Sequence, residues 1–220
     1  MIRDGRVAVN NRTITGMVAA IDPEKDRITV DGRVVQPKTK QTYLLLHKPA
    51  GVVTTCREQR QRKTVLDLLP GGERLFPAGR LDYDTEGLVL MTDDGELANR
   101  LIHPRYQIPK TYLVETAGLL TAEKAAMLES GVELEDGWTR PAEVQTEECG
   151  AEKSRFYLTI KEGRNRQIRR MCKALGLPVT YLCRTKMSFL NLDGLAPGEY
   201  RALEAWELEK LRLALWLEKE

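Results

Sequence analysis

The alternation of apolar and polar positions predicts that strands dominate this chain. Phe156, Leu158 and Ile160 alternate with more polar residues, which is the pattern of a strand with one buried face. Residues 43–47 and 87–91 are mainly apolar runs beside turn residues, and such runs favour buried strands. Further strands are predicted at 6–10, 27–30, 52–54, 110–116 and 179–183.

Predicted helices begin at capping residues and end at glycine or before proline. A short helix follows Thr64, and a second begins at Asp93, where Glu96 completes a start that resembles a capping box. Further helices are predicted at 121–130, at 168–175 and from 204 through 216. Because the helices are placed irregularly among the strands, the predicted fold class is α+β, with a central mixed, largely antiparallel sheet flanked by helices.

The chain divides by composition into a small first unit and a larger second one. Residues 1–40 are rich in turn residues and contain few large apolar side chains, so this unit alone buries little surface. It ends in a predicted linker at 37–40. Residues 41–220 are predicted to form one large domain.

Basic residues gather in one stretch, although the formal net charge of the whole chain is only +2. Residues 81–160 hold 7 Lys or Arg against 16 Asp or Glu. Residues 161–190 hold 8 Lys or Arg against a single Glu. A local basic stripe of this kind predicts a site for a polyanion, and the alternative is a solvated basic face that binds nothing.

Neither a membrane segment nor a metal site is expected from the sequence. The N-terminus lacks the apolar stretch of a signal peptide, and no apolar run approaches the ~18 residues of a membrane span, so we expect a cytoplasmic protein without membrane association. The four cysteines form no C-x-x-C pair and the chain has only two histidines. We expect the thiols to pack as small apolar groups.

The stretch richest in chemical groups is 79–88, Gly-Arg-Leu-Asp-Tyr-Asp-Thr-Glu-Gly-Leu. Its charged residues stand directly before a predicted buried strand, and loops held by a rigid sheet often carry catalytic groups. Such a loop places a carboxylate at the sheet edge beside an arginine. On these residues alone, a polar turn with ordinary capping aspartates remains the simpler interpretation.

The stretch resembles the signature G-R-L-D-x-x-T-E-G-L of the RsuA/RluB-type ribosomal RNA pseudouridine synthases. The resemblance continues at residues 110–112, Lys-Thr-Tyr, and at 162–171, Glu-Gly-Arg-Asn-Arg-Gln-Ile-Arg-Arg-Met, and it extends from about Tyr43 to the C-terminus. It implies the pseudouridine synthase fold and an isomerase that needs no cofactor and no metal. Residues 63–65, Lys-Thr-Val, resemble the branch that acts on large-subunit RNA, with small-subunit RNA as the alternative.

In the reaction that the resemblance implies, the uracil base is cut from ribose C1′, turned within the pocket and rejoined through C5. Asp82 is implied as the catalytic carboxylate, which forms a covalent adduct at either ribose C1′ or uracil C6 and so splits one hard step into two. The resemblance also places Arg169 beside Asp82, where a positive charge would keep the carboxylate ionised. The alternative for Arg169 is one more phosphate-binding cation in a basic helix.

Other positions of the resemblance concern the RNA. Tyr112 would lie against the target uracil, because stacking tolerates a rotating base, or else be an ordinary strand tyrosine. A base in paired RNA must be flipped out, and Arg80 would fill the gap, unless it forms a salt bridge within its loop. The remaining basic positions assigned to RNA binding, mostly as phosphate contacts that set register, are Lys110, Arg164, Arg166, Arg170 and Lys173.

The expected partner is ribosomal RNA, bound by a monomer. Residues 1–40 are expected to be an incomplete S4-like RNA-binding module, because the match to that module begins at Ile2, after the position of its leading helix. Two other functions remain open on the sequence. One is a non-catalytic RNA-binding module with a degenerate enzyme fold, and the other is a glycosidase-like hydrolase that uses Asp82 and Glu86 as its two carboxylates.

Overall fold

A computed structural model describes residues 1–16, 21–22, 25–35, 40–57, 60–71 and 74–216. The chain divides into two compact units, Met1–Gln41 and Thr42–Glu220. Residues 37–39 of the predicted linker lie outside the described part. None of the described helices combines the length and the apolar character that crossing a bilayer requires.

The first unit contains a four-stranded antiparallel sheet, in which the strands follow the order β2-β1-β3-β4. The strands are β1 (Val7–Val9), β2 (Arg12–Ile14), β3 (Ile28–Val30) and β4 (Arg33–Val34). Asn10 and Asn11 both adopt positive φ, which makes the tight turn between β1 and β2. Among the described apolar side chains of this unit, only Val7 is buried. The interpretation of the unit as an S4-like module stays a prediction.

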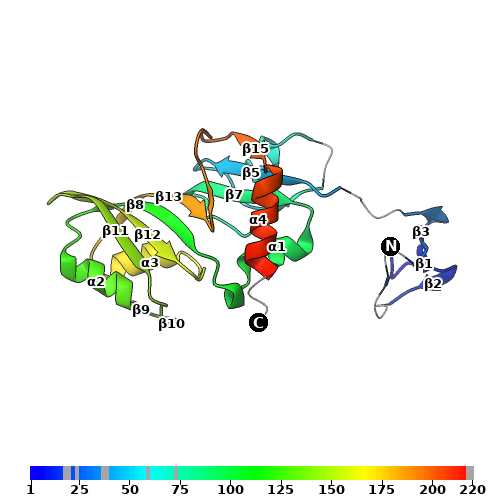
Figure 1. Ribbon diagram of the computed structural model, residues 1–220, viewed down its shortest axis with the longest axis horizontal. Coiled ribbons are helices and arrows are strands. Elements are labelled where there is room, and N and C mark those ends of the chain that lie inside the picture. The colour runs from blue at the N-terminus through cyan, green and yellow to red at the C-terminus, as the bar shows by residue number, and fades with distance from the viewer. Residues whose placement is uncertain (17–20, 23–24, 36–39, 58–59, 72–73, 217–220) are drawn as a thin grey trace. The chain divides into compact units, whose positions relative to one another are not determined.

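The second unit is built on a nine-stranded mixed sheet with the order β11-β12-β8-β13-β7-β5-β15, with β14 paired to β13 and β6 paired to β7 (Figure 1). The pairing of β7 with β13 is parallel, and the others are antiparallel, which confirms the predicted fold class. The strands are β5 (Tyr43–Lys48), β6 (Phe76–Ala78), β7 (Glu86–Thr92), β8 (Lys110–Ala117), β11 (Glu143–Cys149), β12 (Lys153–Ile160), β13 (Val179–Met187), β14 (Leu190–Asn191) and β15 (Tyr200–Ala202). A separate hairpin consists of β9 (Glu133–Leu134) and β10 (Gly137–Trp138).

Each predicted helix is found within a few residues of its predicted bounds, although the segment after Thr64 is a 3₁₀ turn. The helices are α1 (Gly95–Ile102), α2 (Ala122–Ser130), α3 (Gln167–Ala174) and α4 (Ala205–Trp216), with 3₁₀ turns η1 (Val65–Leu68) and η2 (Pro104–Tyr106). The cap of α1 differs from the prediction, because Asp94 accepts the hydrogen bond from Leu97 N. The Asp93 carboxylate instead accepts from Thr42 N at the start of β5.

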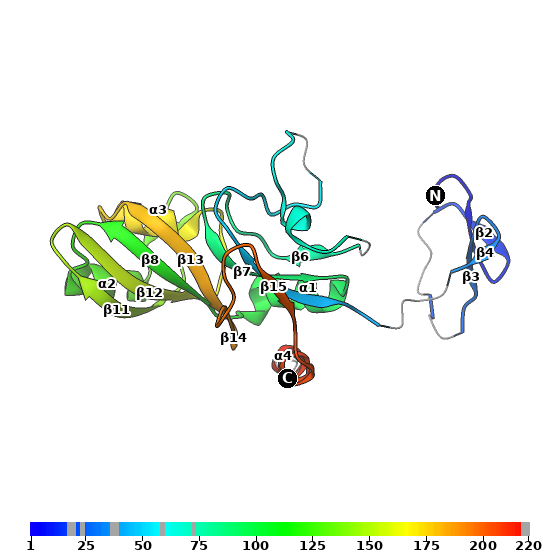
Figure 2. The same ribbon diagram turned by 90° about the horizontal axis from the view of Figure 1, so that it is seen from above.

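Two apolar cores lie on opposite faces of the sheet, because alternate residues of a strand point to opposite sides. Leu44 and Leu46 of β5 belong to the first core, with α2 and α3, whereas Leu45 belongs to the second core, with α1 and α4. Figure 2 shows α3 and α4 on opposite sides of the sheet. Strands β5 and β7 are therefore buried on both faces, which explains their continuous apolar runs.

Two predictions about the second unit are wrong. Residues 52–54 form no strand, and only an isolated bridge joins Val53 to Thr64. The four thiols do not all pack as apolar groups: Cys172 and Cys183 are buried, but Cys56 and Cys149 are exposed.

Candidate active site

The loop between β6 and β7 carries Asp82 and is held by the segment that follows β5. Thr54 is 3% exposed, and its hydroxyl donates to Leu81 O at 2.9 Å while accepting from Leu81 N at 3.3 Å. Gly51 N donates to Tyr83 O at 2.8 Å. The hydrogen bonds on both sides of Asp82 fix the backbone of this loop, whereas the backbone N and O of Val53 bond to Lys63 O and Val65 N.

Gly87 allows β7 to lie directly beside β13. It pairs with Arg184 in the parallel ladder and has a φ of +116°. A Cβ at this position would lie 2.4 Å from both the backbone N and the backbone O of Arg184, which no side chain tolerates. The glycine of the sequence signature is thus required by strand packing, and this packing places the Asp82 loop against β13.

A pocket of about 410 Å³ opens where this loop meets β8, β13 and the start of α3. Asp82 and Tyr112 both line it, together with four of the predicted RNA-binding residues: Arg80, Lys110, Arg164 and Arg166. Arg169, Arg170 and Lys173 are not among the residues that line the pocket. Tyr112 is 9% exposed and belongs to the first apolar core, so its ring is fixed by packing.

The cation nearest to Asp82 is Arg166. Its Nη1 lies 3.7 Å from Asp82 Oδ2, and the Asp82 side chain is 31% exposed. In this structure Arg169 contacts the next acidic residue, Asp84, and the expected pairing of Asp82 with Arg169 stays a prediction. Arg169 Nη2 lies 3.3 Å from Asp84 Oδ2 and donates to Asp84 O at 2.9 Å.

Asp84 connects both arginines to the loop. Arg166 donates to its two carboxylate oxygens, each at 3.0 Å, and Arg169 adds its ion pair from the same helix. The hydrogen bonds from Arg166, opposed by burial and assisted by the charges of both arginines, lower the pKa of Asp84. Asp84 therefore holds Arg166 and Arg169 against the loop, and it is not the simple turn residue that its position suggests.

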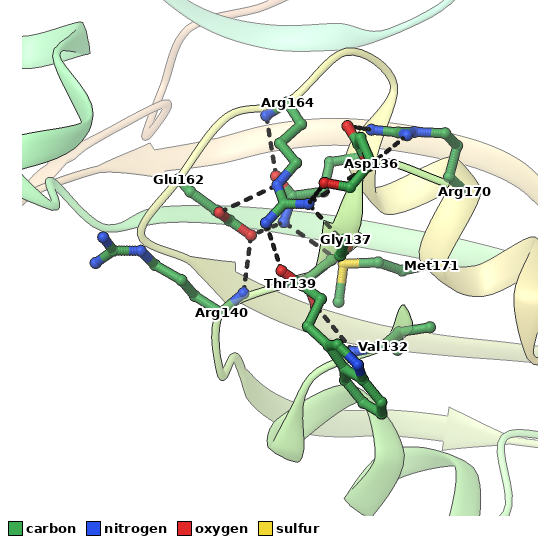
Figure 3. Close-up of polar contacts among 11 residues, drawn as sticks. Val132, Asp136, Gly137, Thr139, Arg140, Glu162, Arg164, Arg170 and Met171 are labelled. Carbon is green, nitrogen blue, oxygen red and sulfur yellow. Dashed lines mark hydrogen bonds and ion pairs between the residues drawn. The ribbon is translucent and has the colours of Figure 1, made fainter. Parts of the chain in front are cut away.

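Arg164 and Arg170, both predicted as phosphate contacts, hold the β9–β10 hairpin (Figure 3). The Arg164 guanidinium donates to the carbonyl oxygens of Asp136, Gly137 and Trp138. Arg170 forms two hydrogen bonds of 2.9 and 3.0 Å with the Asp136 carboxylate. In this structure Arg170 ties α3 to the hairpin and Arg164 ties the segment before α3 to it. A phosphate contact by either arginine stays a prediction.

Arg80, Arg166 and Lys173 are the exposed members of the predicted RNA-binding set. Arg80 and Lys173 have no ion pair among the described residues, so their charges are available to an anion. Arg80 stands at the pocket and Lys173 lies on α3 outside it. The salt bridge within the loop that was the alternative for Arg80 is not seen in the described part.

Two lysines near the site have depressed pKa values. Burial lowers the pKa of Lys110 to about 8, and the charge of Arg184 lowers it further. Burial also lowers the pKa of Lys48 to about 8, opposed by the nearby charges of Glu86, Asp84 and Asp82. Lys48 is fully buried at the end of β5, and its Nζ donates to Pro49 O at 2.9 Å.

Sequence reasoning missed the parts of the site that lie outside the motifs. The sequence around Thr54 and Lys48 predicts only a turn after β5, and it gives no sign that either residue lies near the site. Arg184 belongs to the basic stripe of residues 161–190, yet it is 2% exposed and lines the pocket. Its position after the alternation of residues 179–183 was the available signal, since a strand that continues would bury it. In the described part, no three Asp, Glu, His or Cys side chains gather as metal ligands would.

Comparisons with known proteins agree with this geometry. The family model described as RNA pseudouridylate synthase matches residues 42–174. The chain is 42% identical to the ribosomal large subunit pseudouridine synthase B of Bacillus subtilis (strain 168), over 96% of this chain and 87% of that protein. It is 37% identical to the protein of the same name from Vibrio cholerae, over 100% of this chain and 70% of that protein. Among solved structures, one described as a pseudouridylate synthase superposes with a TM-score of 0.74 at 34% identity, covering 96% of this chain and 90% of that chain.

Proposed function

The chain belongs to the RNA pseudouridylate synthase family, and from this membership we propose that it converts a uridine of large-subunit ribosomal RNA into pseudouridine with Asp82 as the covalent catalyst. The observation that carries the proposal is the meeting of Asp82 and Tyr112 in one pocket that five cationic side chains also line. These groups come from segments far apart in the chain. Their convergence matches what a flipped, negatively charged substrate requires.

Asp82 is suited to nucleophilic work by its surroundings. Its side chain is partly exposed to the pocket, and Arg166 lies 3.7 Å away, outside tight hydrogen-bond range. Arg166 therefore places a positive charge beside the carboxylate without occupying its oxygens. Asp84 meanwhile holds Arg166 in place through two hydrogen bonds, so the cation is oriented before substrate arrives.

The proposed isomerisation uses one carboxylate, which is regenerated at the end of the reaction. If Asp82 attacks ribose C1′, its oxygen bonds to C1′ as the N1–C1′ bond breaks, with the electron pair staying on the uracil ring. The ring then turns, and C5 attacks C1′ and displaces the carboxylate oxygen. The proton on C5 is lost and N1 gains one, and the carboxylate is released unchanged. Tyr112, packed at the pocket wall, supports the base during this turn.

RNA binding in this proposal rests on the second unit. Arg80 would occupy the space that the flipped base leaves, and Lys173 would contact the phosphate backbone. Arg164 and Arg170 would hold the β9–β10 hairpin in place, and Arg169 would hold the loop through Asp84. The first unit would add an S4-like contact, and the protein would act as a monomer.

A glycosidase-like reaction with Asp82 and Glu86 fits the site poorly. Glu86 does not line the pocket, and its carboxylate accepts a hydrogen bond of 2.9 Å from the Tyr181 hydroxyl. Two carboxylates that flank a scissile bond must both face the substrate. The small-subunit RNA, in contrast, is a direct alternative substrate for the proposed reaction, and it enters the test below.

The test is to incubate the purified protein with unmodified transcripts of large-subunit and small-subunit ribosomal RNA, and then to map pseudouridine in both. We expect one modified uridine, in the large-subunit transcript. Modification of the small-subunit transcript alone would correct the substrate. Release of free uracil, or no pseudouridine in either RNA, would overturn the proposal.

A further inference from the structure

Arg184 shares the pocket face of the sheet with Tyr112. The two residues stand directly opposite each other in the antiparallel pair β13–β8, and opposed side chains point to the same face. Lys110 lies two residues before Tyr112 on β8 and therefore points to this face as well. All three side chains line the pocket.

The Arg184 guanidinium is buried and only partly satisfied. The residue is 2% exposed, and its Nε donates to Leu88 O of the neighbouring strand at 2.8 Å. Its Nη2 is buried without a hydrogen-bond partner among the described residues. A buried guanidinium nitrogen left without a partner costs free energy, so a group that carries such a nitrogen into a pocket wall usually serves a ligand.

Lys110 and Arg184 differ from Arg166, Arg169 and Arg170 in having no acidic partner among the described residues. Arg166 and Arg169 pair with Asp84, and Arg170 pairs with Asp136. Lys110 donates to Ile108 O at 3.0 Å, and among the described residues neither it nor Arg184 forms an ion pair. Two neighbouring positive charges in a pocket wall, without a carboxylate between them, create a site for negative charge.

The proposed reaction places negative charge on the uracil ring at this location. When the N1–C1′ bond breaks, the electron pair on N1 delocalises onto the ring oxygens O2 and O4. If the carboxylate adds first at C6, the displaced electrons also reach O4. The ring oxygens therefore gain charge by either route, and fixed donors aimed at developing charge accelerate a reaction strongly.

We propose that Arg184, assisted by Lys110, donates a hydrogen bond to a carbonyl oxygen of the flipped uracil and stabilises the charge that the ring acquires as it is detached. This inference rests on the proposed function and names the group that recognises the base. A backbone phosphate is the less suitable ligand for Arg184, because a side chain 2% exposed is reached through the pocket and the base is the part that enters.

The experiment combines variants of Arg184 with sulfur-substituted substrates. The RNA is a synthetic hairpin that carries the mapped uridine, made also with 4-thiouridine or 2-thiouridine at that position. Sulfur accepts hydrogen bonds more weakly than oxygen. Single-turnover rates and RNA dissociation constants are measured for the parent, for Arg184→Gln and for Arg184→Lys. Arg100→Gln, which removes another buried arginine outside the pocket, is the matched control.

We expect Arg184→Gln to slow conversion of uridine about 10- to 100-fold, as for loss of a hydrogen bond to a charged group, with RNA affinity within about threefold of the parent. One of the two sulfur substitutions should slow the parent but add no further loss in Arg184→Gln, because the same hydrogen bond is already missing. Arg184→Lys should be intermediate, and Arg100→Gln should respond to sulfur as the parent does.

Independent effects of the variant and of both sulfur substitutions would overturn the inference and leave Arg184 as a structural residue. If Arg184→Gln and Arg184→Lys both unfold, Lys110→Gln is combined with the same sulfur-substituted substrates. Independent effects of that variant and of the sulfur substitutions would also overturn the inference. Failure of the proposed function has a different result, because the parent would then convert none of the hairpins.

Discussion

The guanidinium of Arg166 forms two parallel hydrogen bonds, each 3.0 Å long, with the carboxylate of Asp84. The same guanidinium reaches within 3.7 Å of Asp82, so one side chain serves two carboxylates of a single loop. A planar fork can bind one carboxylate at two points while it reaches another, whereas a lysine ammonium is a point charge without this geometry. Among the described residues, Arg166 is therefore the cation that lies beside Asp82, whereas Arg169 lies beside Asp84.

Arg166→Lys should therefore lower the single-turnover rate more than Arg169→Lys does. We expect a loss of about 10- to 100-fold for the first variant, as for one charge-assisted hydrogen bond. Rates are compared on the same RNA at saturating enzyme. A larger loss in Arg169→Lys would instead support the pairing with Asp82 that the sequence predicts, formed once RNA is bound.

Asp82→Asn should abolish turnover while folding and RNA binding are kept. The amide has nearly the same shape but no longer provides an ionised oxygen for the adduct, and loss of a covalent nucleophile removes nearly all activity. Pseudouridine yield and RNA affinity are measured side by side. Turnover within tenfold of the parent would remove Asp82 from the catalytic role.

Gly87→Ala should destabilise the second unit by several kcal/mol or prevent its folding, because the new Cβ would lie 2.4 Å from backbone atoms of Arg184. Gly95→Ala is the matched control, since a Cβ there meets nothing within 4 Å and the position starts α1. This control should be neutral or stabilising by about 0.5–1 kcal/mol. Thermal unfolding measures both, and a Gly87→Ala melting temperature near the parent's would contradict the packing argument.

Lys173 and Arg170 should contribute differently to the salt dependence of RNA binding. Lys173 is exposed, and its removal should flatten the log–log slope by about 0.7–0.9 if it contacts one phosphate. Arg170→Ala should leave the slope nearly unchanged, because Asp136 already neutralises this arginine. Asp136→Asn should steepen the slope by freeing it. Equal flattening by Lys173→Ala and Arg170→Ala would show that RNA displaces Asp136.

Activity should fall as the pH rises through about 8. Lys110 has its pKa lowered to about 8 by burial and by Arg184, so it is charged below that pH and neutral above it. If its charge supports the reaction, the rate declines on the alkaline side. Lys110→Arg should keep activity to higher pH, because arginine stays charged.

Lys48 is the control for this profile, because its pKa is also lowered to about 8 but it does not line the pocket. The alkaline decline should persist in Lys48→Met. A decline that disappears in Lys48→Met but persists in Lys110→Arg would assign the titration to the buried lysine beside Glu86, Asp84 and Asp82 instead.

The local patterns of the sequence were sufficient for the helices, for the longer strands β5, β7, β8, β12 and β13, and for the position of the loop that carries Asp82. Strand β12 followed from a two-residue period, and the ends of α2 followed from Thr121 and Gly131. Such features depend on residues close together in the chain, so a single sequence contains the whole signal. The same holds for the signature at 79–88, because its glycines and charges are contiguous.

Only the tertiary structure decided which charges meet. Arg166 and Asp84 are 82 residues apart, and Arg184 and the strand residue Leu88 that accepts its hydrogen bond are 96 apart. Their contacts depend on the register of β13 against β7 and β8, and on the bulges that shift that register after Arg184. A difference of one residue in register moves every side chain to the other face of the sheet, so no local pattern specifies that Arg184 lines the pocket or that Arg166 reaches Asp82.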